Sequence, residues 1–252
     1  PEDATISHLP ERKELEFEVA ELDVSDIQET NEFLTKQQIG TKKQQRIEQI
    51  IRNLPVQNNF ANDFNEFFSA DEEGVYHNSG LIFCPHKSSR IKSGVDSVVD
   101  YLNNKIPDLK TAYFYGADDN SSGITENITE KNQDLFVSGK RNLMVATKAF
   151  GMGIDKSNIR FTIHFNYPQS IESFVQEAGR AGRDRKPAIN YVIYSVPPGY
   201  DREVNENFFN NTFKGKKKEL DVIEELMTEI TFPAYYKFSL EYYLNITDLL
   251  KL

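Results

Sequence analysis

The sequence predicts an α/β protein in which a parallel sheet carries helices on both faces. From residue 81 onwards, short apolar segments alternate with segments of helical periodicity. Short apolar strands of this kind are typical of parallel sheets that are buried on both faces. In addition, glycine-containing or polar motifs follow directly after two of the strand candidates, which is where such sheets bind ligands.

The N-terminal part is expected to contribute one strand and one helix. Leu15, Phe17 and Val19 alternate with charged residues, which indicates a strand. Residues 41–54 have helical periodicity, and Pro55 is expected to end this helix. Its apolar stripe consists of Ile47, Ile50, Ile51 and Leu54. The polar residues that follow, up to residue 80, predict a loop with room for a short helix.

The remaining elements alternate along the chain. The strand candidates are residues 81–84, 111–115, 143–146, 161–165 and 191–194. The helix candidates are residues 93–104, residues 124–137, a segment that begins at the N-cap residue Ser170, and residues 214–230, which are followed by Pro233. This order is that of a sheet covered on both faces, with a helical tail.

Length and composition are those of a soluble protein. A chain of 252 residues, 38% of them hydrophobic, can form one sizeable core with appendages. No apolar run approaches the ~18 residues that cross a bilayer, and the acidic N-terminus is unlike a secretory signal. The start at Pro1 suggests a piece of a longer protein, although processing could also produce it. A single cysteine, Cys84, excludes an intramolecular disulfide and is compatible with a cytoplasmic location.

Charge is distributed unevenly along the chain. The net charge is −10, which argues against nucleic-acid binding by the chain as a whole. However, residues 1–80 hold 7 basic and 17 acidic residues, whereas residues 140–186 hold 9 basic and 4 acidic residues. The acidity therefore belongs to the N-terminal part, and the basic segment is suited to phosphate groups.

The most informative segment covers residues 176–184, with the sequence QEAGRAGRD. Gln176, Arg180 and Arg183 recur at helical spacing, so they would share one face if the helix from Ser170 continued through them. A guanidinium keeps its charge, and its planar fork matches phosphate oxygens. The pattern therefore predicts stabilisation of a phosphoryl group. For an isolated arginine pair, a solvated basic helix end would be the alternative.

Two upstream segments favour the interpretation that these arginines stabilise a phosphoryl group. Residues 145–156 read VATKAFGMGIDK, and residues 81–88 read LIFCPHKS. Together with the arginine segment, and in this order, they resemble motifs V, IV and VI of superfamily 2 helicases, above all those of the RecQ-like branch. The resemblance extends over residues 81–195, under half of the chain, and concerns the second of two RecA-like motor domains.

In helicases of this type, ATP lies between the two motor domains, and the resemblance implies roles for five residues. Arg183 takes the position of the arginine finger, Arg180 that of its companion contact to phosphate, and Gln176 helps to order the interface. Gly153 and Asp155 take the positions that approach the nucleotide sugar and couple it to the nucleic-acid site. A turn that only fixes the backbone is the alternative for the last two.

The nucleic-acid track is expected after two of the strands. By resemblance, Thr147 faces a phosphate of the bound strand, and His86, Lys87 and Ser88 line its path. A helix cap and an ordinary polar loop, respectively, are the alternatives. His164, within an apolar strand, is expected to be packed rather than to bind a ligand, and no histidine or cysteine spacing predicts a metal site.

Some parts of a complete motor are absent from the sequence. No GxxxxGK[ST] loop occurs, so ATP and Mg²⁺ are expected to be bound mainly by a missing first motor domain, and the chain alone should not hydrolyse ATP. We expect an acidic N-terminal segment leading from that domain (residues 1–75), the second RecA-like domain (76–199) and a helical extension (200–252). Residues 197–252 lack cysteine, unlike the zinc region usual in RecQ proteins, which favours a divergent relative.

The expected function is therefore that of the C-terminal motor domain of an ATP-dependent DNA helicase. Its partners would be single-stranded or forked DNA and the first RecA-like domain of the same chain, with no membrane involved. Three alternatives remain: an RNA helicase, a translocase that does not unwind, and a catalytically silent interaction module. The first two would share this domain, whereas the third would lack a phosphate-binding loop upstream.

Overall fold

A computed structural model describes most of the chain up to residue 202. The described residues are 12–27, 31–87, 90, 92–116, 123–148, 150, 154–168, 170–197 and 201–202. The predicted helix at 214–230 and nearly all of the extension at 200–252 lie outside these residues, as do Gly153 and Ser88. Within the described part, no helix is long and apolar enough to cross a membrane.

The centre of the molecule is a six-stranded sheet in which every neighbouring pair is parallel. Its strands, in chain order, are β1 (Leu15–Asp23), β2 (Ser79–Phe83), β3 (Thr111–Phe114), β4 (Leu143–Ala146), β5 (Ile159–His164) and β6 (Ala188–Val196). In space the order is β1-β6-β5-β2-β4-β3. The expected α/β architecture with a parallel sheet is thus confirmed.

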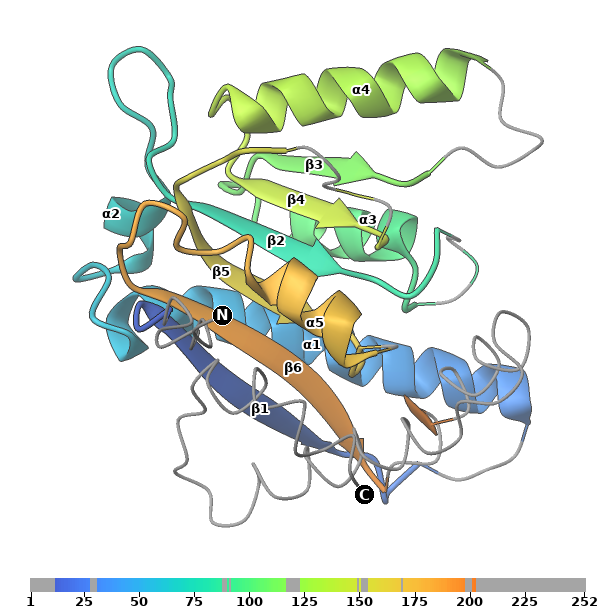
Figure 1. The fold of residues 1–252 in the computed structure, drawn as a ribbon. Helices are drawn as coiled ribbons and strands as arrows, with labels where there is room; N and C mark the ends of the chain where they lie inside the picture. The colour runs from blue at the N-terminus through green and yellow to red at the C-terminus, as the bar shows by residue number, and fades with distance from the viewer. Residues whose placement is uncertain are drawn as a thin grey trace, which may run out of the picture.

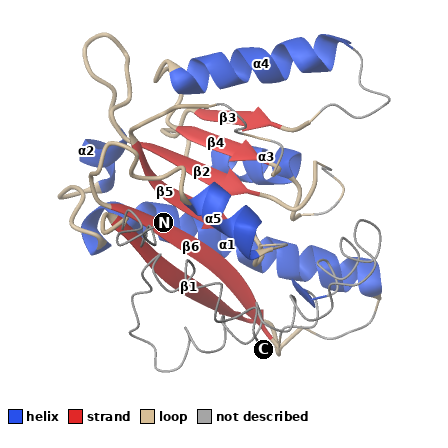
Figure 2. Ribbon diagram, in the orientation of Figure 1, coloured by secondary structure: helices blue, strands red, loops and turns tan. Residues whose placement is uncertain are grey.

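Among the described residues, five helices pack on the two faces of this sheet (Figures 1 and 2). They are α1 (Glu32–Gln57), α2 (Phe64–Phe68), α3 (Val95–Lys105), α4 (Gly123–Val137) and α5 (Ile171–Ala178). Side chains of α1, α2 and α3 enter the core on one face, and those of α4 and α5 enter the core on the other. Both faces are therefore covered, as the apolar strands require.

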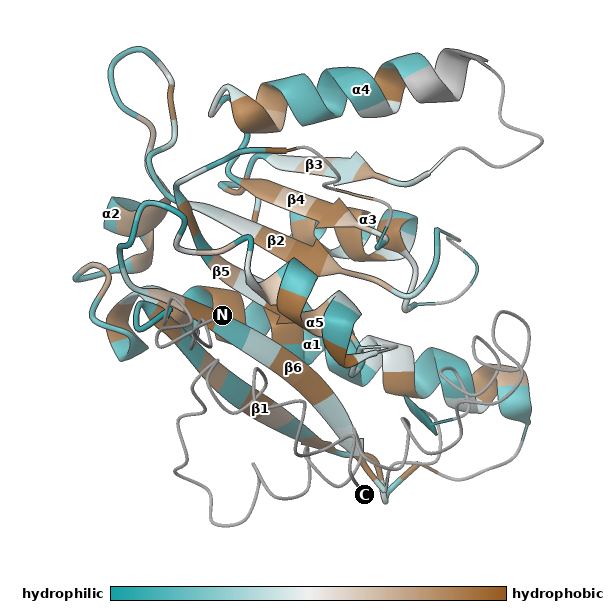
Figure 3. Cartoon of the chain, viewed as in Figure 1, coloured by the Kyte–Doolittle hydropathy of each residue, from teal (hydrophilic) through white to brown (hydrophobic). Residues whose placement is uncertain are grey.

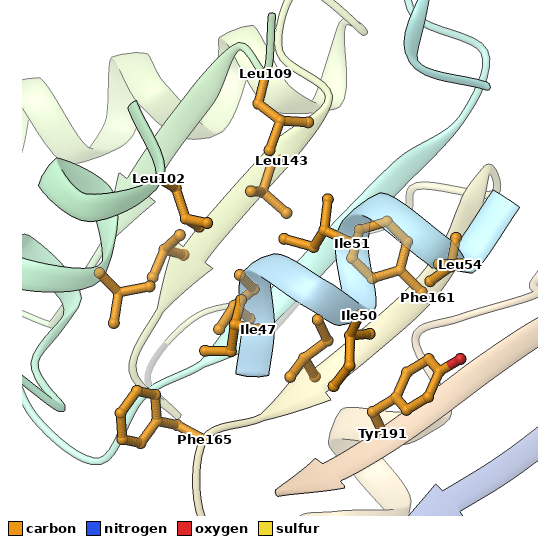
Figure 4. Close-up of a cluster of buried hydrophobic side chains, with 14 of the residues drawn as sticks. Ile47, Ile50, Ile51, Leu54, Leu102, Leu109, Leu143, Phe161, Phe165 and Tyr191 are labelled. Carbon is orange, nitrogen blue, oxygen red and sulfur yellow. The ribbon is translucent and has the colours of Figure 1, made fainter. Parts of the chain in front are cut away.

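The core on the α1 face is continuous and largely aliphatic. Ile47, Ile51 and Leu54 of α1 lie over the sheet together with Leu102 of α3 (Figure 4). The sequence at Gly80 permits this packing, because a Cβ there would lie 2.0 Å from the Phe161 ring. Figure 3 shows that the central strands are mostly hydrophobic, whereas the loop before β2 is mostly hydrophilic.

Helix α1 is longer than the predicted 41–54. It begins after the N-cap Asn31, whose side chain accepts a hydrogen bond from the backbone of Phe33 at 2.9 Å. In its first turns Phe33 and Leu34 are exposed and the residues from Thr35 to Gln38 are polar, so no buried apolar stripe marks this part. Pro55 does not end the helix, which continues for two residues; its missing N–H removes only one bond near the helix end.

The N-terminal elements belong to the same folded unit as the motifs. β1 pairs with β6 along its whole length, from Leu15 opposite Ala188 to Asp23 opposite Val196. Helix α1 fills the core beneath the central strands. The sheet and core therefore begin at Leu15, well before residue 76, where we expected the domain to start.

A buried lysine links α1 to the residues that follow the carboxyl ends of β5 and β6. Lys43 has no exposed side-chain surface, and its Nζ donates to Phe165 O at 2.9 Å, Asn166 Oδ1 at 2.6 Å and Asp201 Oδ1 at 2.5 Å. Asp201 Oδ2 accepts from the backbone N of Ser195 at 2.7 Å. Burial lowers the pKa of Lys43, and the Asp201 carboxylate opposes this change. The charge is thus compensated by three oxygens in the interior.

Candidate functional site

The arginine segment begins as a helix and then turns away from it. The hydroxyl of Ser170 accepts from the backbone N of Ser173 at 3.1 Å and caps α5, as the sequence predicted. However, α5 ends at Ala178, with Gly179 as its C-cap. The helix therefore does not continue through Arg183, and Gln176, exposed on α5, shares no helical face with the two arginines.

Residues 179–183, the arginine turn, follow α5. Gly182 has φ of +61°, a conformation that strongly favours glycine, and its N–H donates to Ile159 O at 2.9 Å. A Cβ on Gly182 would also lie 3.1 Å from Glu14 Cγ. These local constraints stop the helix and direct the arginines along the sheet instead of away from it.

Arg183 contacts the segment that precedes β5. Its Nη1 donates to Ile154 O at 2.8 Å and to Asp155 Oδ1 at 3.0 Å. Both side chains keep access to solvent, 35% for Arg183 and 86% for Asp155, so the ion pair is a weak one. The fold thus brings together two of the predicted site residues that are 28 positions apart in the sequence.

Arg180 lies beside Arg183 and is half-buried. Burial and the neighbouring charge of Arg183 lower the pKa of Arg180, whereas Glu177 acts in the opposite direction. An anion that binds near both guanidinium groups would favour the charged form of Arg180. The arrangement is suited to phosphate oxygens, which each guanidinium fork can bind in a bidentate manner.

A third arginine, which the motif comparison did not single out, contacts the arginine turn from the N-terminal side. Arg12 Nη2 donates to Ala181 O at 2.7 Å, and its Nη1 donates to Gly179 O at 3.3 Å. Glu14 pairs with the Nε of Arg12 and, at 3.3 Å, with Nη1 of Arg185. No sequence signal marks Arg12, because it precedes a strand and belongs to no periodic pattern.

The predicted residues fall into two groups at opposite ends of the strands. The arginine turn lies at the amino end of β5, where Gly182 bonds to Ile159. By contrast, Thr147 follows the carboxyl end of β4, and His86 and Lys87 follow that of β2. Only the second group, the carboxyl-edge set, lies where parallel sheets usually bind ligands.

Within the carboxyl-edge set, Lys87 and His86 are held by neighbours. Lys87 Nζ lies 4.4 Å from the centroid of the Tyr115 ring, a cation–π contact. His86 Nε2 is 3.3 Å from Ser93 Oγ, and burial lowers the pKa of this imidazole. The backbone N of Thr147 donates to the strand β3 carbonyl of Phe114 at 3.2 Å, which places Thr147 between the ends of β3 and β4.

A small pocket of about 50 Å³ lies between the carboxyl ends of β2 and β5 and helix α5. His164 and Glu177 face each other in it, with Nε2 and Oε2 3.0 Å apart. The His164 ring is buried and packs against the rings of Phe83 and Phe174. His164 is thus a packed side chain, as its position in an apolar strand indicated.

Lys156, the last residue of the segment 145–156, anchors the part of the chain before β5. Its Nζ lies 5.1 Å from the Phe136 ring centroid and 3.5 Å from Val137 O, at the end of α4. Burial lowers the pKa of Lys156 to about 8. This contact fixes the segment that carries Asp155 to the face of the sheet that α4 and α5 cover.

Comparison with known proteins identifies the central part of the chain. The helicase conserved C-terminal domain family matches residues 66–185. The ATP-dependent helicase wrn-1 of Caenorhabditis elegans is 34% identical over 173 residues, which are 68% of this chain and 14% of that protein. The ATP-dependent DNA helicase RecQ of Haemophilus influenzae is 42% identical over 122 residues, 48% of this chain and 17% of that protein.

Other relatives give the same picture. The ATP-dependent DNA helicase hus2/rqh1 of Schizosaccharomyces pombe is 36% identical over 132 residues, 52% of this chain and 9% of that protein. The chain therefore spans less than a fifth of the length of these three relatives. Domain 2 of the DEAD-box helicase Mss116p, bound to an RNA duplex, aligns at 13% identity and a TM-score of 0.42, over 71% of this chain and 54% of its own, too distant to bear on function.

Proposed function

Since this chain contains a helicase conserved C-terminal domain of the RecQ-like branch of superfamily 2, we propose that it serves as the second motor domain of an ATP-dependent DNA helicase. In this role it closes on a first RecA-like domain that holds most of the nucleotide. It then completes the site for hydrolysis with groups of its own. Closing and opening of the cleft between the domains moves the protein along a nucleic-acid strand.

The observation that carries the proposal is the pair of neighbouring cations at the arginine turn. Burial and the nearby charge of Arg183 lower the pKa of Arg180, and Arg183 is held in place by a solvent-accessible ion pair with Asp155 at 3.0 Å. In the proposed mechanism, Arg183 leaves Asp155 and contacts the γ-phosphate when the domains close. An arginine supplied in this way stabilises charge in the transition state and contributes about 10³- to 10⁵-fold to the rate.

The remaining nucleotide contacts are assigned to neighbouring residues. Arg180 binds a second phosphate oxygen, and Gln176 orders the interface from the exposed side of α5. Asp155, released by Arg183, accepts a hydrogen bond from a ribose hydroxyl, with Gly153 beside it. ATP and its Mg²⁺ are held mainly by the first domain, while this chain supplies the cationic side.

Nucleic acid is assigned to the carboxyl-edge set. Thr147 and Lys87, together with His86 and Ser88, contact the phosphate backbone of single-stranded or forked DNA. Such contacts carry no base specificity, so RNA is an open alternative substrate. The proposal takes residues 76–199 as the conserved part of the motor, with β1 and α1, from within residues 1–75, completing its sheet and core.

The proposal also places the protein in the cytoplasm. Cys84, the only cysteine, is buried, and burial raises the pKa of its thiol. Such a thiol is unreactive and does not require an oxidising compartment. Immunofluorescence of the full-length protein tests this location directly.

ATP hydrolysis by the full-length protein tests the proposal. We expect stimulation by single-stranded DNA, and a loss of about 10³-fold or more in kcat for Arg183→Ala while ATP binding survives. The matched control is Arg141→Ala. Arg141 lies outside both residue groups, and within the described residues the hydrogen bond of its side chain is one from Nη1 to Lys140 O at 3.2 Å. Equal activity of Arg183→Ala and wild type would remove Arg183 from catalysis.

The same assay separates the alternatives. Stronger stimulation by RNA than by DNA would indicate an RNA helicase. ATP hydrolysis without strand separation in an unwinding assay would indicate a translocase. Absence of hydrolysis with every nucleic acid, in a protein with no phosphate-binding loop upstream, would leave an interaction module.

A further inference from the structure

The arginine turn is held from a part of the chain that lies outside the family match at residues 66–185. Arg12 immediately precedes the first strand, 167 and 169 positions away from the two carbonyls that it binds. These are Gly179 O and Ala181 O, which lie on either side of Arg180. One guanidinium therefore binds the backbone both before and after one of the two proposed phosphate contacts.

Carbonyls at this point need an external donor. Helix α5 ends at Ala178, so the carbonyls that follow have no partner in a next helical turn. The fork of an arginine can bind two acceptors at once, whereas the ammonium of a lysine acts as a point charge. A cation at the carboxyl end of a helix also offsets the negative end of the helix dipole.

Arg12 is itself fixed to the sheet. Its Nε pairs with Glu14, whose side chain is only 7% exposed and also accepts from Arg185. Burial alone would raise the pKa of Glu14, but hydrogen bonds and the two arginines lower it overall, so the carboxylate stays charged. The backbone N of Ala188 donates to Glu14 O at 2.8 Å, which extends the β1–β6 pairing to this point.

We propose that Arg12 is a positioning residue for Arg180 and Arg183. It transmits the rigidity of the β1–β6 pair to the arginine turn, and so holds the two guanidinium groups where the γ-phosphate arrives. Arg12 does not contact the nucleotide. The inference rests on the proposed function, because a positioning role requires that the two arginines act on ATP.

The test measures DNA-stimulated ATP hydrolysis by the full-length protein carrying Arg12→Ala or Arg12→Lys. A misplaced turn weakens contacts made in the transition state, so we expect kcat to fall about 10- to 100-fold while the KM for ATP changes less than about 3-fold. Arg12→Lys keeps the charge and can replace one of the two hydrogen bonds. It should therefore recover part of the lost kcat.

Arg52 provides a matched control on the opposite face. Its Nη2 donates to Lys105 O, at the end of α3, at 2.7 Å, and its Nε pairs with Glu48 at 2.9 Å. Arg52→Ala thus removes the same kind of contact far from the arginine turn. We expect it to lower the melting temperature and to leave kcat unchanged, which separates a general loss of stability from a positioning effect.

A double variant distinguishes failure of this inference from failure of the proposed function. If Arg12 acts through Arg183, then Arg12→Ala costs much less kcat in an Arg183→Ala background than in wild type. A full additional loss in the double variant, or a kcat for Arg12→Ala equal to that of Arg52→Ala, would overturn the positioning role. An inactive Arg183→Ala beside a fully active Arg12→Ala rejects the inference alone, whereas a fully active Arg183→Ala rejects the proposed function.

Discussion

The two faces of the sheet hold their cationic side chains in different surroundings. On the α1 face, Lys43 is buried among aliphatic side chains, and three oxygens, one of them a carboxylate, compensate its charge. On the α5 face, Arg180 and Arg183 lie near each other, and the only carboxylate bonded to Arg183 within the described residues is the exposed Asp155. A buried, fully compensated charge fixes the structure, whereas a guanidinium in a solvent-accessible ion pair can exchange its partner for a ligand.

The same contrast extends to the apolar side chains. The α1 face is filled by a long helix whose stripe packs continuously against the central strands. The α5 face is covered by α4, by the eight-residue α5, by the arginine turn and by the segment that carries Asp155. Both faces thus contribute buried cores to stability, and the second also carries the side chains that we assign to the nucleotide. Substitutions on the two faces should separate these contributions.

The largest expected effect comes from breaking the buried charge pair. Lys43→Met should destabilise the chain by about 3–5 kcal/mol, because it leaves Asp201 buried without its cation. Urea denaturation followed by circular dichroism measures the change. The double variant Lys43→Met/Asp201→Leu should recover much of the loss. A single variant as stable as wild type would contradict the structural role of the pair.

Removal of apolar volume from the α1 face should have the next largest effect. Ile51 has no exposed surface, and Ile51→Ala should lower the free energy of unfolding by about 2–5 kcal/mol through the lost burial and the resulting cavity. Val56, on the same helix, is 55% exposed, so Val56→Ala should change it by less than about 0.5 kcal/mol. Similar losses for both would argue against the observed orientation of α1.

The α5 face should respond more weakly, through its helix cap. Ser170→Ala removes the hydroxyl that accepts from Ser173 N and should cost about 1 kcal/mol in unfolding free energy. Ser170→Asp retains an acceptor and should restore the wild-type value. Chemical denaturation of the three proteins side by side makes the comparison. Equal losses for alanine and aspartate would exclude the cap as the cause.

The smallest effect is a dependence on pH through Lys156. Its pKa in the folded protein is lowered from 10.5 to about 8, so folding is opposed below pH 8, where the lysine must be charged, and this opposition fades between pH 8 and 10.5. Relative to Lys156→Met, wild type should therefore gain stability as pH rises through this window. We expect less than about 1 kcal/mol in total, below the roughly 1.4 kcal/mol per pKa unit of a fixed group, because the flexible lysine side chain can carry its ammonium towards solvent. Denaturation midpoints at pH 7 and pH 10 provide the measurement, and a constant difference would refute the shift.

Much of this architecture follows from local patterns. The strands at 143–146 and 111–115 and the cap at Ser170 appear close to where the sequence predicts them, because each depends on a few consecutive residues. The sequence does not indicate the beginning of α1, because its first apolar residues, Phe33 and Leu34, are exposed and do not continue the buried stripe. The end of α5 was missed as well, because a glycine with positive φ and a contact to Ile159 stop the helix.

The sequence by itself determined the order of strands and helices, the apolar faces that they bury, and the motifs that identify a helicase C-terminal domain. Only the tertiary structure decided that Arg183 meets Asp155, that Lys43 meets Asp201, and that Arg12 binds the carbonyls around Arg180. The physical reason is separation along the chain. Periodicity acts over a few residues, whereas Arg12 reaches the arginine turn only because β1 pairs with β6 at the edge of the sheet.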